Sequence, residues 1–129
     1  MLSYEELFQM LDELVVSMPQ ELYSRLNGGV NLQPGFKMHP VAQNNDFYVL
    51  GEYHAGGWLG RYINIYYGSF SRVHGHMQPE QQREELEKVL KHELLHHLEA
   101  LAGECELEKK DADKIRDYLQ RKMGKNLSH

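Results

Sequence analysis

Apolar side chains in the first segment of the chain recur at the spacing of an α-helix. They stand three or four residues apart, at Leu7, Met10, Leu11, Leu14 and Val15. Ser3 and Glu6 precede them with the spacing of a capping box, in which each side chain accepts a hydrogen bond from the other residue's backbone N–H group. The pattern predicts an amphipathic helix from residue 4 to about residue 17.

A second, shorter helix is expected to follow directly. Pro19 suits the first turn of a helix, because its fixed φ and its missing N–H group are tolerated there. Leu22 and Leu26 would then point inward. The segment Asn27-Gly28-Gly29 would end this helix, because asparagine and glycine tolerate left-handed backbone.

Residues 30 to 77 have a different pattern, in which aromatic and β-branched residues dominate the apolar positions and glycine recurs. This pattern predicts short strands at residues 30–32, 47–53 and 61–67. In the third strand, alternation puts Ile63, Ile65 and Tyr67 on one face, which we expect to be the core face.

A long helix is expected from Pro79, which suits a first helical position, to about residue 102. One side of it would hold Leu86, Leu90, Leu94 and Leu101. The nearly opposite side would hold Glu85, His92, His96 and Glu99. Such a helix can bury its leucines and still present its histidines to a cleft. A last helix is expected from about residue 111 to residue 122.

Length and charge narrow the class of protein. The chain has 129 residues and 41% hydrophobic content, which is enough for the core of one compact domain. We therefore expect residues 1–129 to form a single domain. The net charge of −5 argues against a nucleic-acid partner. The first residues do not have the pattern of a secretory leader, and no apolar run is long enough to span a membrane, so we expect neither a leader nor a membrane span. Cys105 is the only cysteine, so no intrachain disulfide can form. We expect a cytoplasmic protein, with a monomer favoured.

The segment His92-Glu93-Leu94-Leu95-His96 has the spacing HExxH. Two imidazoles four residues apart stand on one helical face with Cβ atoms about 5–6 Å apart, so both can reach one zinc ion. Glu93 would lie beside the ion, where it can take a proton from a water that the ion activates and deliver it to a leaving amine. The motif predicts a zinc-dependent hydrolase with His92 and His96 as ligands and Glu93 as general base.

A catalytic zinc ion needs a third protein ligand, and several acidic residues follow the motif. Glu99 lies about 10.5 Å along the helix axis from His92, so it could share the ion only by straining or breaking the helix. Glu104 follows Gly103, whose backbone can end the helix and turn the chain back toward the ion. Glu104 is therefore the preferred third ligand. The alternatives that remain are Glu99, Glu106, Glu108, Asp111 and Asp113.

Three segments carry a family resemblance in their order and spacing. They are Val49-Leu50-Gly51-Glu52-Tyr53, then residues 61–68, and then the HExxH segment extended by His97. The chain resembles the small, minimal zincin-like proteins that are labelled metallopeptidases. The resemblance implies an α+β fold with helices packed on a small mixed β-sheet, an HExxH active-site helix, a zinc cofactor, and a peptide or protein substrate.

The chain departs from the longer pattern of that family, HExxHxxGxxD. Glu99 occupies the glycine position and Ala102 the aspartate position. If two residues are inserted after Leu98, the resemblance places Glu104 at the position of the acidic ligand.

Other polar and aromatic residues are candidates for supporting roles. Oxyanion stabilisation requires a hydrogen-bond donor opposite the general base. The candidates are Tyr66, Tyr67, His74 and His76. His97 is expected to be buried and hydrogen-bonded, and Trp58 could lie on a lip of the cleft. The spacing of the remaining histidines, His39, His54 and His129, suggests no site.

Two further expectations concern binding. If residues 61–67 formed an edge strand beside the active helix, they could pair with an extended substrate peptide. Two alternatives to an enzyme stay open. One is a non-catalytic, zinc-stabilised protein-interaction module, and the other is a metal-free interaction domain.

Overall fold

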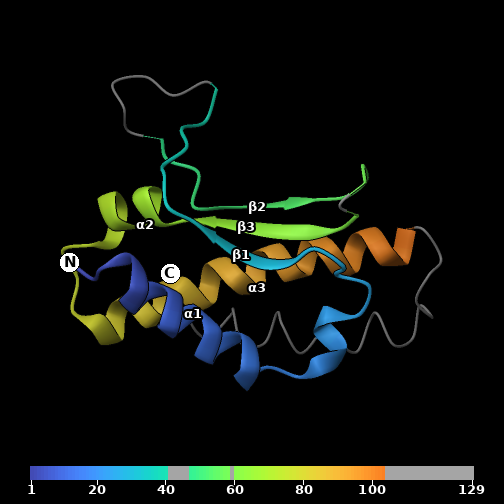
Figure 1. Ribbon diagram of the computed structural model, residues 1–129, viewed down its shortest axis with the longest axis horizontal. Coiled ribbons are helices and arrows are strands. Elements are labelled where there is room, and N and C mark those ends of the chain that lie inside the picture. Colours follow the sequence, from blue (N-terminus) through green and yellow to red (C-terminus); the bar gives the residue numbers. More distant parts are fainter. Residues whose placement is uncertain (41–46, 59, 104–129) are drawn as a thin grey trace, which may run out of the picture.

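The computed structural model describes residues 1–40, 47–58 and 60–103 of the chain (Figure 1). The helices and strands, in chain order, are α1 (Tyr4–Ser17), the 3-10 helix η1 (Gln20–Tyr23), β1 (Gly29–Gln33), β2 (Gly51–His54), β3 (Tyr62–Tyr66), α2 (Tyr67–His74) and α3 (Pro79–Gly103). The helix expected at residues 111–122 lies outside the described residues. No helix within the described ranges has the length and apolar content needed to cross a membrane.

The three strands form one mixed sheet in the order β1-β3-β2 (Figure 1). β1 runs parallel to β3, and β2 runs antiparallel to it with Tyr53 opposite Ile63. The prediction of an α+β fold with helices on a small mixed sheet is confirmed. The idea that residues 61–67 form an edge strand is wrong, because β3 pairs on both sides. The strand at the edge beside α3 is β2.

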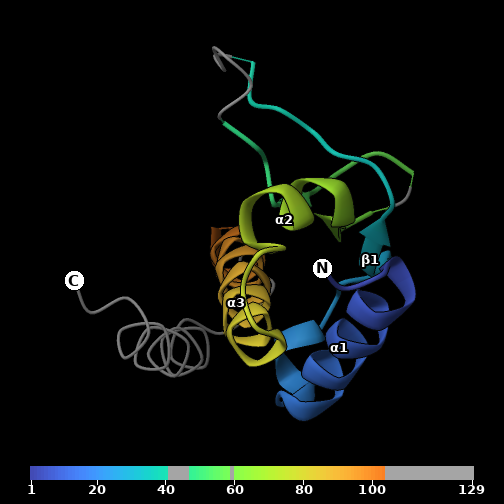
Figure 2. The same cartoon turned by 90° about the vertical axis from the view of Figure 1, so that its left-hand side faces the viewer.

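Helices α1 and α3 lie against each other on one face of the sheet (Figures 1 and 2). Ile63 and Ile65 point from β3 into this layer and are fully buried, as the alternation predicted. The helices contribute Leu7, Leu11, Leu14, Leu86, Leu90, Leu94, Leu98 and Leu101, all buried. Because the leucine side of α3 is used in the core, its histidine side faces outward.

Helix α1 forms as predicted. The Ser3 side chain accepts a hydrogen bond from the Glu6 backbone N–H, and the Glu6 carboxylate accepts one from the Ser3 N–H. The second helix is shorter than predicted, because η1 follows its N-cap Pro19 and ends at Tyr23 with Ser24 as C-cap, so Asn27-Gly28-Gly29 does not end it. Leu22 and Leu26 are buried, as expected.

Helix α2 was missed by the sequence pattern. Tyr67 begins this helix instead of ending β3 on the core face. The segment after it is rich in glycine and serine, which have low helix propensity. Tertiary contacts hold it instead. Gly68 donates its N–H to the Gly35 carbonyl, and a Cβ at Gly68 would lie only 2.7 Å from the Gly35 backbone.

The second predicted strand is also shorter than expected. Residues 47–49 pair with residues 37–39 and not with β3. His39 donates its N–H to the Phe47 carbonyl, and Val49 donates its N–H to the Lys37 carbonyl. β2 therefore begins only at Gly51. The alternation in the sequence is the same for both pairings, so it could not separate them.

Candidate active site

Helix α3 holds His92 and His96 one turn apart on its exposed side. Their Nε2 atoms are 3.1 Å apart, and the two rings are nearly perpendicular at 89°. Two nitrogens that bind one zinc ion at about 2.0–2.1 Å, with a tetrahedral angle between them, are ~3.3 Å apart. The separation of the two nitrogens is therefore close to that of two ligands of one metal ion.

The surroundings of His92 favour its neutral form. Partial burial lowers the pKa of His92, and the neighbouring His96 lowers it further, while the charge of Glu99 acts in the opposite direction. A neutral imidazole offers a nitrogen lone pair, which is the form that binds a metal ion.

The third ligand is not found in the part of the chain that the structure describes. Within residues 1–40, 47–58 and 60–103, no three His, Cys, Asp or Glu side chains come together in a way that could hold a metal ion. Glu99 lies within these residues and is not part of such a group. Glu104 and the acidic residues after it lie outside the described residues.

Glu93 lies between the two histidines in sequence but points to a different place. Its side chain is turned toward β2, and only 7% of the residue is exposed. Burial raises the pKa of the Glu93 carboxyl, and the negative charge of Glu52 raises it further. His96 and a hydrogen bond from the Tyr53 backbone N–H oppose this rise. A carboxylate with raised proton affinity beside a cleft suits the role of a general base.

Gly51 allows β2 to approach Glu93 this closely. A Cβ atom at position 51 would lie 2.9 Å from Cγ1 of Val89 and 3.3 Å from Cγ of Glu93. Real Cβ atoms do not approach other heavy atoms at the first of these distances. Glycine is therefore required for the present contact between β2 and α3.

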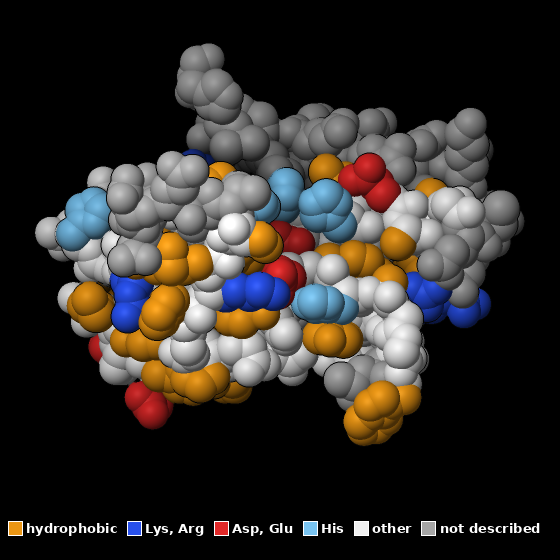
Figure 3. Space-filling view, turned by 90° about the horizontal axis from the view of Figure 1, so that it is seen from above, with side chains coloured by type: hydrophobic (Ala, Val, Ile, Leu, Met, Phe, Trp, Pro, Cys, Tyr) orange, Lys and Arg blue, Asp and Glu red, His pale blue; other side chains and the backbone are white. Residues whose placement is uncertain are grey.

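Two open clefts meet at Glu93. The cleft on the His96 side has a volume of about 430 Å³ and is lined by Glu52, Tyr53, His54, Glu93, His96 and Ala100. The cleft on the His92 side has a volume of about 490 Å³, and its apolar wall includes Phe47, Val49, Leu50 and Val89. In a view from above, Figure 3 shows histidine, carboxylate and basic side chains near the centre of the molecule's upper face, with apolar side chains around them.

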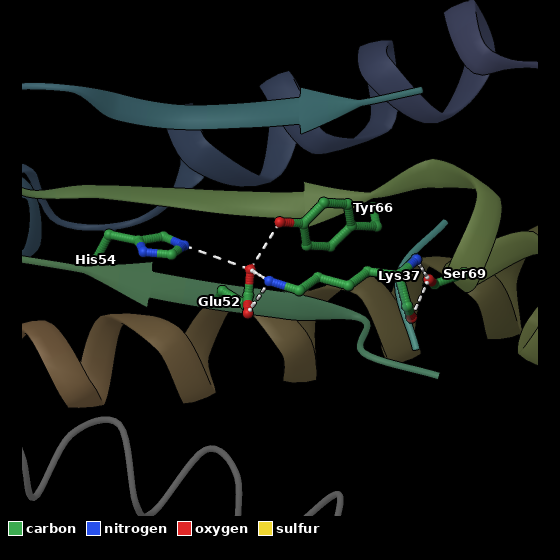
Figure 4. Close-up of polar contacts among 5 residues, drawn as sticks. All are labelled: Lys37, Glu52, His54, Tyr66 and Ser69. Carbon is green, nitrogen blue, oxygen red and sulfur yellow. Dashed lines mark hydrogen bonds and ion pairs between the residues drawn. The ribbon is translucent and has the colours of Figure 1, made fainter. Parts of the chain in front are cut away.

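Sequence reasoning missed Glu52 and His54, which line the polar cleft with Glu93 and His96. The spacing of His54 in the sequence suggested no site. Figure 4 shows both side chains on β2, with Lys37 and Tyr66 beside Glu52. No local spacing could have found them, because they reach the site through the packing of β2 on α3.

The residues expected to stabilise an oxyanion do not line either cleft. The Tyr66 hydroxyl donates to Glu52 at 2.7 Å, and the Tyr67 hydroxyl donates to the Leu2 carbonyl at 2.6 Å. His74 lies 3.9 Å from Glu85, and His76 is exposed.

His97 is fully buried, as expected. Its Nδ1 lies 2.8 Å from the Tyr53 hydroxyl and its Nε2 lies 2.7 Å from the Ser24 carbonyl. Its role is therefore structural. Trp58 is 94% exposed and lines neither cleft.

Comparison with known proteins shows a relative without an assigned activity. No protein-family model matches the chain, and no curated protein matches it. A solved structure of a "Conserved hypothetical protein (TTHA0227)" from Thermo thermophilus is 33% identical to the chain, with a TM-score of 0.70. The match covers 79% of this chain and 99% of that chain. At this identity and coverage, the chain belongs to the same family as that conserved hypothetical protein.

Proposed function

We propose that the protein is a zinc-dependent hydrolase of the metallopeptidase type, which cleaves peptide bonds. In this proposal, His92 and His96 bind zinc, Glu104 supplies the third ligand, and Glu93 is the general base. The observation that carries the proposal is the pairing of two converging, exposed imidazoles with a buried carboxylate of raised pKa.

The chemistry divides between the metal and the chain. Bound zinc would polarise the substrate carbonyl and lower the pKa of a water molecule toward about 7. Glu93 accepts the proton of the attacking water and later delivers it to the leaving nitrogen. The hydrogen bond from the Tyr53 N–H orients the Glu93 carboxylate for both transfers.

The edge of β2 supports a peptide as the substrate. The Tyr66 N–H donates to the Leu50 carbonyl, so in this antiparallel pair the backbone groups of alternate β2 residues point toward β3. Those of Gly51 and Tyr53 point away from β3, toward the clefts at Glu93. Because the Tyr53 N–H donates to Glu93, the groups left for a peptide are the Tyr53 carbonyl and the backbone groups of Gly51. An extended peptide could pair with this edge as an added strand.

A zinc-stabilised interaction module is the alternative from another class. Structural zinc sites are enclosed by four protein ligands, whereas catalytic sites keep one position open to solvent. Both His92 and His96 are exposed and lie next to open clefts, which favours the catalytic alternative.

The test combines metal content with peptide cleavage. Tag-free protein, the His92→Ala/His96→Ala variant and the Glu93→Gln variant are analysed for zinc and incubated with an internally quenched peptide library. We expect about one zinc ion per chain in the wild type and in Glu93→Gln, none in the double variant, and cleavage by the wild type alone. If the zinc-loaded wild type cleaves no peptide, the hydrolase is excluded and the zinc-stabilised interaction module is the alternative that remains. A wild-type protein that takes up no zinc would exclude both the zinc-dependent hydrolase and the zinc-stabilised interaction module.

A further inference from the structure

His54 differs from a structural histidine in its surroundings. His97 has both ring nitrogens engaged by Tyr53 and Ser24 and is fully buried. The His54 side chain is 39% exposed and lines the cleft that it shares with Glu93 and His96. Among the described residues, only its Nε2 atom has a hydrogen-bond partner, the Glu52 carboxylate at 3.4 Å. Its Nδ1 has no hydrogen-bond partner in the described part of the chain.

The orientation of the His54 ring is fixed from two sides. The ring stacks on Tyr62 with centroids 4.8 Å apart and an interplanar angle of 16°. Glu52 holds the Nε2 edge of the ring (Figure 4). A side chain that faces solvent and is still oriented by two neighbours is prepared to bind, because little rotamer freedom is lost on binding.

Glu52 is itself held in place. Lys37 Nζ donates to its two carboxylate oxygens at 2.7 and 2.8 Å, and the Tyr66 hydroxyl donates at 2.7 Å (Figure 4). Lys37 is anchored in turn by the buried Ser69, whose Oγ accepts a hydrogen bond from the Lys37 backbone N–H at 2.8 Å. The carboxylate behind His54 is therefore a rigid acceptor, and hydrogen bonds from three directions fix its position.

His54 and Glu93 also line the same cleft. Tyr53 donates its backbone N–H to Glu93, and His54 is the next residue along β2. A ligand in the cleft that they share would lie near both side chains. Resting on the proposed function, we propose that His54 is a catalytic residue that donates a hydrogen bond from Nδ1 to the carbonyl oxygen of the scissile peptide bond.

Glu93 and His54 supply the proton transfers and the hydrogen bond that peptide hydrolysis requires. The water oxygen bonds to the carbonyl carbon, one water proton passes to Glu93, and the carbonyl π electrons move onto oxygen. In its imidazolium form, His54 donates Nε2–H to Glu52 and Nδ1–H to that oxyanion. The C=O bond then re-forms from an electron pair of the oxyanion, the C–N bond breaks with its electron pair going to nitrogen, and nitrogen takes the proton from Glu93. His54 keeps its proton throughout.

The first test is kinetic, on the zinc-loaded protein with the internally quenched peptide library. His54→Gln should lower kcat roughly 10²-fold, as does the loss of one oxyanion donor in other hydrolases, with KM changed by less than about threefold. Free imidazole should restore part of the activity of His54→Ala. The matched control is His76→Gln, which removes an exposed histidine that lines neither cleft.

The second test measures binding in place of turnover. In the Glu93→Gln background, His54→Gln should weaken a phosphonamidate peptide, which mimics the oxyanion, about tenfold or more. Binding of the corresponding uncleaved peptide should stay within about threefold, because the ground state carries no oxyanion.

The outcomes separate this inference from the proposed function. A wild type that cleaves peptides together with a His54→Gln variant of equal kcat overturns the role of His54 alone. Equal weakening of the peptide and the phosphonamidate does the same. A zinc-loaded wild type that cleaves no peptide overturns the proposed function and, with it, the catalytic role of His54.

Discussion

The backbone N–H of Tyr53 donates a hydrogen bond to the carboxylate of Glu93, which joins the edge of the sheet to the candidate active-site helix. The same residue reaches α3 a second time through its hydroxyl, which lies 2.8 Å from Nδ1 of His97. The position of the candidate base relative to the clefts therefore depends on how closely β2 packs on α3.

Replacing Glu93 by glutamine should stabilise the metal-free protein. Burial raises the pKa of this carboxyl, so the folded state binds a proton more readily than the unfolded state. The folded protein therefore loses stability as the pH rises from the unfolded pKa through the folded pKa. Glutamine carries no charge to desolvate, and a gain of roughly 0.5–1 kcal/mol at pH 7 is expected, as at other functional sites.

Urea unfolding in the presence of a chelator measures this gain. The same experiment at pH 4, where the wild-type carboxyl is protonated, should show a smaller difference between the two proteins. A Glu93→Gln variant that is less stable at pH 7 would contradict the expectation.

Alanine at position 51 should separate β2 from α3. The new Cβ would meet Cγ1 of Val89 at 2.9 Å, and overpacking of this kind costs about 1–3 kcal/mol. Gly35→Ala is the matched control, because nothing lies within 4 Å of a Cβ there. Val89→Ala removes the obstructing methyl group and should restore part of the stability of Gly51→Ala. Urea unfolding of the four variants forms the test, and additive effects at positions 51 and 89 would exclude a direct clash.

Removing the Tyr53 hydroxyl should weaken the same contact from the other side. Tyr53→Phe deletes the hydrogen bond to the buried His97, at a cost of about 1–3 kcal/mol. Tyr48→Phe is the control, since no hydrogen bond of its hydroxyl occurs among the described residues, and it should change stability by less than about 0.5 kcal/mol. Equal unfolding midpoints for Tyr53→Phe and the wild type would show that the Tyr53 hydroxyl adds nothing to the contact.

The Glu52 cluster should make stability depend on pH in acid. Burial raises the pKa of the Glu52 carboxyl, but hydrogen bonds from Lys37, Tyr66 and His54 outweigh it, and the net shift is downward. A lowered folded pKa contributes stability that is present above the ordinary value of 4.5 and is lost as the pH falls through the folded pKa. Glu52→Gln should therefore lower the free energy of unfolding at pH 7. The difference from the wild type should disappear as the pH falls below about 4.

Denaturant unfolding of the wild type and Glu52→Gln at pH 7 and at pH 3 measures the difference. If the two proteins differ in free energy of unfolding by the same amount at both pH values, the lower stability of Glu52→Gln comes from packing and not from the charge of Glu52. The result also bears on His54, whose ring is oriented by this carboxylate.

The sequence by itself determined the local elements and one side of the site. The capping box at Ser3 and the leucine period after Pro79 act over a few residues, so the pattern alone predicts α1 and α3. The spacing of His92 and His96 on one helical face follows from the helix period, and their nitrogens converge for that reason.

The tertiary structure alone decided the other side of the site. Whether β3 is central, where β2 begins and which residues face Glu93 depend on pairings between distant segments, and an alternating pattern allows several of them. Helix α2 forms from residues of low helix propensity because Gly68 packs on Gly35. Glu52 and His54 reach the cleft only because Gly51 lets β2 lie against α3, and such a contact leaves no periodic trace in the sequence.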